Sequence, residues 1–451
     1  MFAGKLNENI RNNDLVLHCV NVKIFQKLIG GMELSGHGTI KINEVGTLYL
    51  EFICTEKHNA PKSLFGERFP QDALDKSQSL HLEALTVDGE LFEASNFFME
   101  VSYRLHNLPA VQYIFLPSIS CKKTAKEGYY DKESDYLYFE FVEKLDIPFN
   151  KSNTSESSLG SASVSWNQAD IKMEGYLVTI IHHKDHTSVV VKGIFDIDVV
   201  RESLKFYIGF SSGSMPQLGY MDERKGTECI KRLSSINNTR KQQTAASPLV
   251  TVPHEYHYNL FKCITKLYAE KHSRFESIVA QWERVWFASQ SKDEILSLTL
   301  SVAIEGVLND IYIPYIKSSQ DTAEDKIEHS FIKNELRNTA LTDQQKSRIL
   351  GSVANWKNIT SANAFDHLIE KGLFENKDKS DWTKLRNRCA HPKLIAKNIE
   401  DEKAEIELIT SCLNILFRLI LNTLEYTGDV AYLIPRQWPK LYLFEHCNIL
   451  D

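Results

Sequence analysis

Three observations predict an α+β protein of two parts, with a β-rich, sandwich-like N-terminal region followed by an α-helical bundle. The chain has 451 residues, more than one ordinary hydrophobic core supports, so at least two domains are expected. Up to residue 235, apolar residues alternate or run in short β-branched and aromatic segments, which is typical of strands. From residue 255 onward they recur at intervals of three and four, the period of an amphipathic helix.

The N-terminal region, residues 1–235, is therefore predicted to be β-rich. Segments 177–183 and 187–192 are rich in Val and Ile and are separated by a short polar turn, which predicts a hairpin. A polar run starting at Asn150 either forms one long loop or separates two subdomains near residues 150–160. Further strand-like runs cover 38–43, 47–53 and 136–142.

A helical domain is predicted over residues 255–451, after a linker at 236–254 that is polar and has prolines at 248 and 253. One helix should begin at Ser291, with Glu294 completing a capping box. Pro314 should end or kink this helix, because proline lacks the backbone N–H that the helix needs. Later helices are expected at 342–356, 361–373, 380–391 and 400–426.

Composition limits the function classes. The formal net charge is −7, so any binding to nucleic acid must come from a local basic patch. The eight cysteines form no C-x-x-C pair, which argues against a zinc ribbon or a thioredoxin-like site. The first residues lack an apolar signal sequence, and the apolar stretch 408–421 is too short to span a membrane. We expect a cytoplasmic protein without membrane association.

The candidate site lies in the segment 380–392. Ser380 or Asp381 is expected to cap a short helix, and Trp382, Leu385 and Cys389 are expected to form its buried face. Pro392 disfavours helical geometry at the residue before it, so the helix should end at His391. Arg386 precedes His391 by just over one helical turn, and the two side chains can therefore converge on one cleft.

Arg386-Asn387-x-x-x-His391 resembles the R-x4–6-H signature of HEPN-domain ribonucleases, in which an Asn often follows the Arg. This resemblance covers roughly residues 255–430. A β-rich region before a C-terminal HEPN domain is similar to the layout of the ApeA family of bacterial anti-phage proteins. A loose glycine-and-strand pattern at 30–36 agrees with that family.

The pattern needs support from its context, because a chain with 15 histidines contains roughly 1.5 such matches by chance. A second match, from Arg11 to His18, lies in a turn followed by a strand and is interpreted as a decoy. Near the first match, Glu305 occupies an otherwise apolar stripe on the predicted helix 291–313. A buried carboxylate needs a partner, and Arg386 is the expected one. Basic residues also surround the motif: Lys384, Arg388, Lys393 and Lys397.

The resemblance implies cleavage of RNA without a metal or cofactor, by attack of a ribose 2′-OH that leaves a 2′,3′-cyclic phosphate. His391 suits the proton transfer because imidazole titrates near neutral pH. Arg386 would stabilise the charge that develops on the phosphate, Asn387 would orient His391 or a phosphate oxygen, and Glu305 would hold Arg386. Substrate contacts are expected from Arg388, Lys384 and Lys393.

The expected partners follow from the same resemblance. HEPN nucleases usually place two motifs around one cleft, which predicts a homodimer through the helical domain, or a higher oligomer built from it. The substrate would be RNA, with transfer RNA as the leading candidate, and a phage-derived component would act as the trigger. The alternative is a non-catalytic dimerisation and binding protein with a β-rich sensor. A toxin of a toxin–antitoxin pair is a third hypothesis, which the large β-rich region disfavours.

A metal site is not expected. His182, His183 and His186 flank the predicted hairpin turn, but adjacent strand residues point to opposite faces of a sheet. His182 and His183 therefore cannot easily bind the same ion. The aromatic pairs 97–98 and 282 with 286 are interpreted as core residues rather than as stacking platforms for bases.

Overall fold

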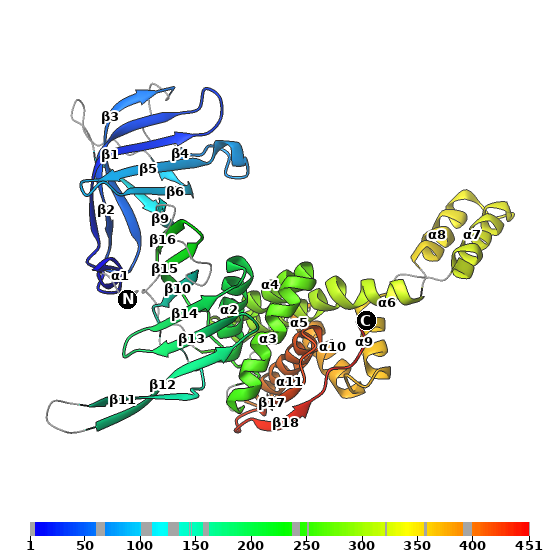
Figure 1. The fold of residues 1–451 in the computed structure, drawn as a ribbon. Helices are drawn as coiled ribbons and strands as arrows, with labels where there is room; N and C mark the ends of the chain where they lie inside the picture. Colours follow the sequence, from blue (N-terminus) through cyan, green and yellow to red (C-terminus); the bar gives the residue numbers. More distant parts are fainter. Residues whose placement is uncertain are drawn as a thin grey trace. The chain divides into compact units, whose positions relative to one another are not determined.

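The computed structural model describes residues 5–59, 68–100, 111–124, 135–143, 145, 147–156, 162–236, 244–249, 252–320, 323–355, 359–390 and 399–450. The chain forms two compact units (Figure 1). One comprises residues 1–201 and 216–242, and the other comprises residues 202–215 and 243–451. The first is rich in strands and the second in helices, which confirms the predicted α+β architecture of two parts.

Fourteen strands of the β-rich unit form one sheet. Their bounds are β1 Val16–Gln26, β2 Glu33–Ile42, β3 Leu48–His58, β5 Leu80–Thr86, β6 Leu91–Phe97, β8 Val111–Leu116, β9 Ser118–Thr124, β10 Tyr136–Phe141, β11 Lys151–Glu156, β12 Ala162–Lys172, β13 Tyr176–His182, β14 Thr187–Gly193, β15 Leu218–Lys225 and β16 Glu228–Ser234. Their order is β11-β12-β13-β14-β10-β15-β16-β9-β6-β5-β1-β2-β3-β8. A sandwich was expected, but these described strands form a single continuous sheet, because β16 pairs with β9 and β9 with β6.

Alternation of apolar residues determines which face of the sheet is buried. In β5, Leu80, Leu82 and Ala84 are fully buried, while the residues between them face the other side. β13 and β14 form the predicted hairpin, with His182 paired to Thr187. The remaining elements of this unit are the helix α1 (Lys5–Arg11), the short helix η1 (Lys76–Gln78) and a small sheet of β4 (Arg68–Phe69) and β7 (Met99–Glu100).

A helix lies inside the region that was predicted to be β-rich. This helix, α2 (Ile197–Ser212), connects β14 to β15, and its residues from Glu202 onward belong to the helical unit. Phe210 packs edge-to-face against Trp282 and Phe417, with ring centroids 5.3 and 5.8 Å away. The aromatic spacing of α2 was not recognised as helical because its segment is flanked on both sides by clear strands.

The expected linker at 236–254 is partly built into the helical unit. Ser247 and Leu249 are buried, and the Ser247 hydroxyl donates a hydrogen bond to the carbonyl of Ser211 at 2.7 Å. The backbone N–H of Ala431 donates to the carbonyl of Pro248 at 2.7 Å. Residues 237–243, 250 and 251 lie outside the described part of the chain. Polar composition suggested an exposed linker, but hydrogen bonds to distant backbone groups allow this segment to be buried.

The helical unit contains nine described helices apart from α2 and one π-helical segment, followed by a two-stranded sheet. The bounds are α3 His254–Glu270, α4 His272–Ser289, α5 Asp293–Val307, η3 Leu308–Tyr312, α6 Ile313–Gln320, α7 Ala323–Asn338, α8 Asp343–Asn355, α9 Ser361–Glu370, α10 Asn376–Ala390, α11 Ile399–Thr423, β17 Gly428–Tyr432 and β18 Lys440–Phe444. The four later helices were therefore predicted close to their observed positions.

The start and the end of the predicted helix 291–313 differ from the structure. The residue that caps α5 is Lys292, and its side chain makes no capping hydrogen bond, so Ser291 and Glu294 form no capping box. Pro314 does not end the helical path, because α6 continues through it directly after the π-helical segment η3. A π-helical turn changes the backbone hydrogen-bond register locally. The segment η3 lies in the turn before Pro314, where a regular α-helix would lack one hydrogen bond because proline has no backbone N–H.

The stretch Asp293–Lys317 is the one described helical run that is long and apolar enough to cross a membrane. Half of its most apolar window is buried inside the protein. This is weak evidence for a membrane span, since a core helix of a soluble protein has the same composition.

The contacts of Glu425 with two lysines should make the stability of the helical unit depend on pH. Its carboxylate accepts hydrogen bonds from Lys266 Nζ at 2.7 Å and Lys271 Nζ at 2.9 Å, and these lysines lower the pKa of Glu425 from 4.5 to about 2. A lowered carboxyl pKa stabilises the fold above the unfolded-state value and loses that effect as the pH falls toward the folded-state value. Glu425→Gln should therefore lower the free energy of unfolding at neutral pH by about 1.5 kcal/mol.

The difference between wild type and Glu425→Gln should disappear as the pH falls from 4.5 to about 2. Urea unfolding followed by the loss of helical circular dichroism, repeated across this range, measures it. Glu445→Gln is the control, because Glu445 is an exposed carboxylate near the same end of the chain. A difference of the same size at neutral pH and at pH 2 would show that the lysine contacts are not its source.

Candidate active site

Arg386 lies on α10, whose other side is fixed in the core of the helical unit. Trp382 and Leu385 are buried as predicted, and the side chain of Cys389 is outside the described part. The helix begins earlier than expected, at Asn376, so neither Ser380 nor Asp381 caps it. Asp381 is buried inside the bundle instead, where it accepts a hydrogen bond from Ser411 at 2.9 Å.

The predicted ion pair between Arg386 and Glu305 is present. Arg386 Nη2 donates to Glu305 Oε1 at 3.0 Å, and the two side chains are 51% and 28% exposed. The guanidinium also lies 5.8 Å from the centre of the Trp382 ring. An arginine has five N–H donors in a planar fork, so Glu305 fixes one edge and leaves donors on a half-exposed cation for an anionic ligand.

Trp382 fixes α10 against two other helices and thereby gives Arg386 a rigid base. Its indole N–H donates to the carbonyl of Ser301 on α5 at 3.2 Å. Its ring stacks on Phe365 of α9, with centroids 5.6 Å apart and planes 16° apart. The Arg386–Glu305 pair therefore joins α10 to α5, one turn along α10 from the buried Trp382, which contacts both α5 and α9.

The surroundings of Glu305 differ from the prediction. Ile295, Leu298 and Val302, expected to be buried, are 50%, 49% and 52% exposed. The core contacts of α5 come from another face, which carries Leu300, Ile304 and Val307. The predicted partner of Glu305 is correct, but the reason for it was only partly right, because the stripe is apolar but faces outward.

The other expected site residues fall into two groups. Lys384, Asn387 and Arg388 are exposed on α10, and Lys384 lies 3.8 Å from Asp381. Within the described residues, Asn387 and Arg388 have no ion pair or side-chain hydrogen bond. His391 and Lys393 lie outside the described part of the chain, as does Lys397. The last described residue of α10 is Ala390, directly before His391.

One polar contact beside the site was missed by the sequence reasoning. Asn309, in the π-helical segment η3, accepts a hydrogen bond from the hydroxyl of Ser361 at 3.1 Å. Asn309 is exposed and lies four residues after Glu305. Ser361 begins α9, where Thr360 and Asn363 form a capping box. The T-x-x-N pattern was visible in the sequence, but its contact with η3 depends on how the helices pack.

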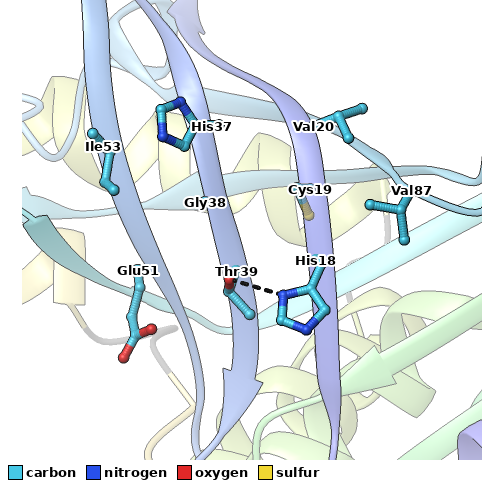
Figure 2. A pocket seen from close by; sticks show the side chains of 9 residues that line it. All are labelled: His18, Cys19, Val20, His37, Gly38, Thr39, Glu51, Ile53 and Val87. Carbon is cyan, nitrogen blue, oxygen red and sulfur yellow. Dashed lines mark hydrogen bonds between the residues drawn. The ribbon is translucent and has the colours of Figure 1, made fainter.

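Arg11 and His18, which form the second match to the motif, each make contacts within the β-rich unit. Arg11 on α1 donates to Glu140 Oε2 at 2.7 Å, and Glu140 is buried and also bonded by Asn7 and Tyr138. His18 lies on β1, where its ring nitrogen is 3.4 Å from the hydroxyl of Thr39 (Figure 2). The arginine and the histidine thus belong to separate side-chain clusters, in agreement with their interpretation as a chance match.

The pocket around His18 has a volume of about 300 Å³ and also contains His37 and Glu51 (Figure 2). Glu51 is occupied by an ion pair with Lys41 at 2.6 Å. No group of three side chains in the described residues is arranged to hold a metal ion. We therefore assign no metal to this pocket.

The histidines of the β13–β14 hairpin have separate surroundings. His182 packs edge-to-face against Phe149, with ring centroids 4.4 Å apart. His183 stacks on His186 at 4.1 Å and lies 2.9 Å from the hydroxyl of Ser188. Burial and the neighbouring His186 lower the pKa of His183. His182 and His183 therefore point to different environments, as the alternation of a strand requires.

No model of a protein family, no curated protein and no solved structure matches this chain. Its function must therefore be inferred from the geometry of the site and from the motif that contains it. The structure describes two residues of that motif, Arg386 and Asn387. It also describes Glu305, the ion-pair partner of Arg386.

Proposed function

We propose that this protein is a metal-independent endoribonuclease of the HEPN type, related to the ApeA anti-phage family and acting in the cytoplasm. The observation that carries the proposal is the geometry of Arg386. Glu305 and Trp382 hold its guanidinium on a rigid helix, half-exposed, five residues before His391. A fixed cation that is still open to solvent suits an anionic substrate better than a purely structural ion pair does.

In the proposed reaction, the ribose 2′-oxygen attacks the adjacent phosphorus and the bond from phosphorus to the 5′-oxygen breaks. His391 accepts the proton of the 2′-OH, and an imidazolium at the same cleft returns a proton to the leaving 5′-oxygen. Arg386 binds two phosphate oxygens and stabilises their developing charge. Asn387, Lys384, Arg388 and Lys393 provide further contacts to the RNA backbone. The products are a 2′,3′-cyclic phosphate and a 5′-OH end.

A homodimer would supply the second imidazole. Ile295, Leu298 and Val302 form an outward apolar stripe on α5, each about half exposed. This stripe follows i, i+3 and i+7 spacing and leads directly to Glu305, so the surface is continuous with the site. Exposed apolar residues at such spacing are typical of a helix that packs against a partner. A second copy of this chain, placed by a two-fold axis, would bring two motifs to one cleft.

The β-rich unit is proposed to control the nuclease, because an unrestrained ribonuclease would be toxic to its own cell. Its roles would be to recognise a phage-derived trigger and to present the RNA, with transfer RNA as the first substrate to test. The control of abortive infection would then reside in this unit and the chemistry in the helical unit.

The test is incubation of purified wild type and His391→Ala with total cellular RNA in EDTA, followed by mapping of the RNA ends. Cleavage by wild type alone, leaving cyclic-phosphate ends, supports the proposal and identifies the substrate. His18→Ala is the matched control and should cleave like wild type. Equal cleavage by wild type and His391→Ala, or loss of wild-type cleavage in EDTA, would refute it. Phage protection that survives His391→Ala would favour the non-catalytic binding protein.

A further inference from the structure

A second pocket crosses five strands of the β-rich unit. It has a volume of about 390 Å³, within the range of small-ligand pockets. Its lining comes from β1, β5, β6, β9 and β16, which are consecutive in the sheet. We call it the cross-strand pocket. Its side chains fall into an aromatic end, an acidic middle and a basic, hydroxyl-rich end.

Strand pairing places these side chains in a row across one face of the sheet. Glu83 pairs with Glu93, Glu93 with Ser120, and Ser120 with Arg232. On β1 this row ends at Lys23, which pairs with Glu83, and Phe25 pairs with His81 in the neighbouring row, two residues along the same strands. Adjacent strands are about 4.8 Å apart, so the pocket extends about 14 Å from β1 to β9 and about 19 Å from β1 to β16.

The aromatic end consists of Phe25 and His81, whose rings lie 5.7 Å apart and are tilted by 33°. Both side chains are half-buried. Burial and the nearby Lys27 lower the pKa of His81, which keeps its ring uncharged at neutral pH. Two neighbouring uncharged rings at one end of the pocket offer a flat ligand ring a place to stack.

The acidic middle consists of Glu83 and Glu93, directly opposite each other on β5 and β6. Within the described residues neither carboxylate has an ion pair. Like charges at directly opposed strand positions destabilise a sheet. Ligand groups that donate hydrogen bonds, such as hydroxyl groups, would relieve this repulsion, because an ionised carboxylate only accepts.

The basic end contains Arg232 with the hydroxyls of Ser118 and Ser120. Arg232 is half-buried and has no ion-pair partner within 4.0 Å among the described residues. Its planar fork can bind two oxygens of one phosphate, and serine hydroxyls add further donors. This end of the pocket is therefore suited to an anion, in contrast to the middle.

We propose that the cross-strand pocket binds a nucleotide, with its base stacked against the rings of Phe25 and His81, its ribose hydroxyls on Glu83 and Glu93, and its phosphates on Arg232. The three chemistries follow one another across the sheet in the order in which a nucleotide carries them. The nucleotide is either free or one unit of a single-stranded RNA, since both present the same groups. This pocket is distinct from the helical site, and its assignment does not depend on the proposed nuclease activity.

The test is calorimetric titration of the full chain, in the His391→Ala background to prevent cleavage, with ATP, AMP, adenosine and a hexamer of adenylate. Arg232→Ala and Glu83→Gln should each weaken binding at least tenfold, and Ser120→Ala less, while Lys151→Ala on β11 serves as the control. Adenosine should bind more weakly than AMP, because it lacks the anion for Arg232. Ser120→Ala removes only a half-buried hydroxyl, so it keeps the test valid if a larger change disturbs folding.

Two results support the proposal and identify the source of the nucleotide. Binding of ATP or AMP that Arg232→Ala weakens points to a free nucleotide, and binding of the hexamer alone points to RNA. Absence of binding by all four probes overturns the proposal. So does affinity that is unchanged in Arg232→Ala, Glu83→Gln and Ser120→Ala, or equal affinity for adenosine and AMP.

Discussion

Arg386→Ala is expected to lower the rate of RNA cleavage by about 10²- to 10³-fold, the usual cost of removing one donor to a developing oxyanion. The fold should survive, because Arg386 is half exposed and the packing of α10 depends on Trp382 and Leu385. The measurement is a single-turnover rate on a defined RNA, together with the thermal unfolding midpoint of each variant. Lys377→Ala, an exposed residue in the first turn of the same helix, should cleave like wild type.

Two further variants separate the role of the charge from the role of the geometry. Arg386→Lys keeps the charge but loses the planar fork, so only part of the rate should return. Glu305→Gln keeps a hydrogen-bond acceptor for Arg386 and should reduce the rate less than Arg386→Ala does. If Arg386→Ala cleaves as fast as wild type, the ion pair is structural and the site must lie elsewhere.

If the proposed homodimer forms through α5, Leu298→Asp should yield a monomer and reduce RNA cleavage to the level of Arg386→Ala. Leu298 is 49% exposed in the centre of the apolar stripe, so an aspartate there is tolerated in the monomer. In a two-fold interface it would place two carboxylates close together against apolar surface, which is costly. Sedimentation velocity measures the association, and the cleavage assay measures its consequence.

Leu443→Asp is the matched control, because Leu443 is 56% exposed in the same half of the chain but lies on β18 rather than on the stripe. It should remain dimeric and active. A Leu298→Asp protein that is monomeric yet fully active would show that one chain contains a complete site. A protein that stays dimeric would show that a surface other than α5 forms the interface.

The outcome for the site shows where sequence reasoning succeeds. The contact between Arg386 and Glu305 joins residues 81 positions apart, and it was predicted from a charged residue on an apolar stripe. The reason given was burial, but Glu305 is partly exposed and the stripe faces outward. Helical periodicity gives the direction of a side chain relative to its own helix. Whether that direction is inside or outside depends on the partners of the helix, which the periodicity does not reveal.

For the fold as well, features set by neighbouring residues were predicted and features set by long-range contacts were not. Strand alternation and helical periodicity predicted the two-part architecture, the β13–β14 hairpin and the late helices, because these are properties of neighbouring residues. Helix α2 and the buried segment near Ser247 were missed. Their stability comes from contacts with residues such as Trp282 and Ala431, which lie far away in the sequence.

The sequence by itself determined the succession of a β-rich part and a helical part, the local acidic and basic balance, and the spacing of Arg386 five residues before His391. These follow from short-range periodicity and from covalent spacing. Only the tertiary structure decided which face of α5 is exposed, that Arg11 is bound to Glu140, and that Glu83, Glu93 and Arg232 form one row. The pairing of distant strands and helices is set by the packing of the whole core, and a local pattern fits many such pairings equally well.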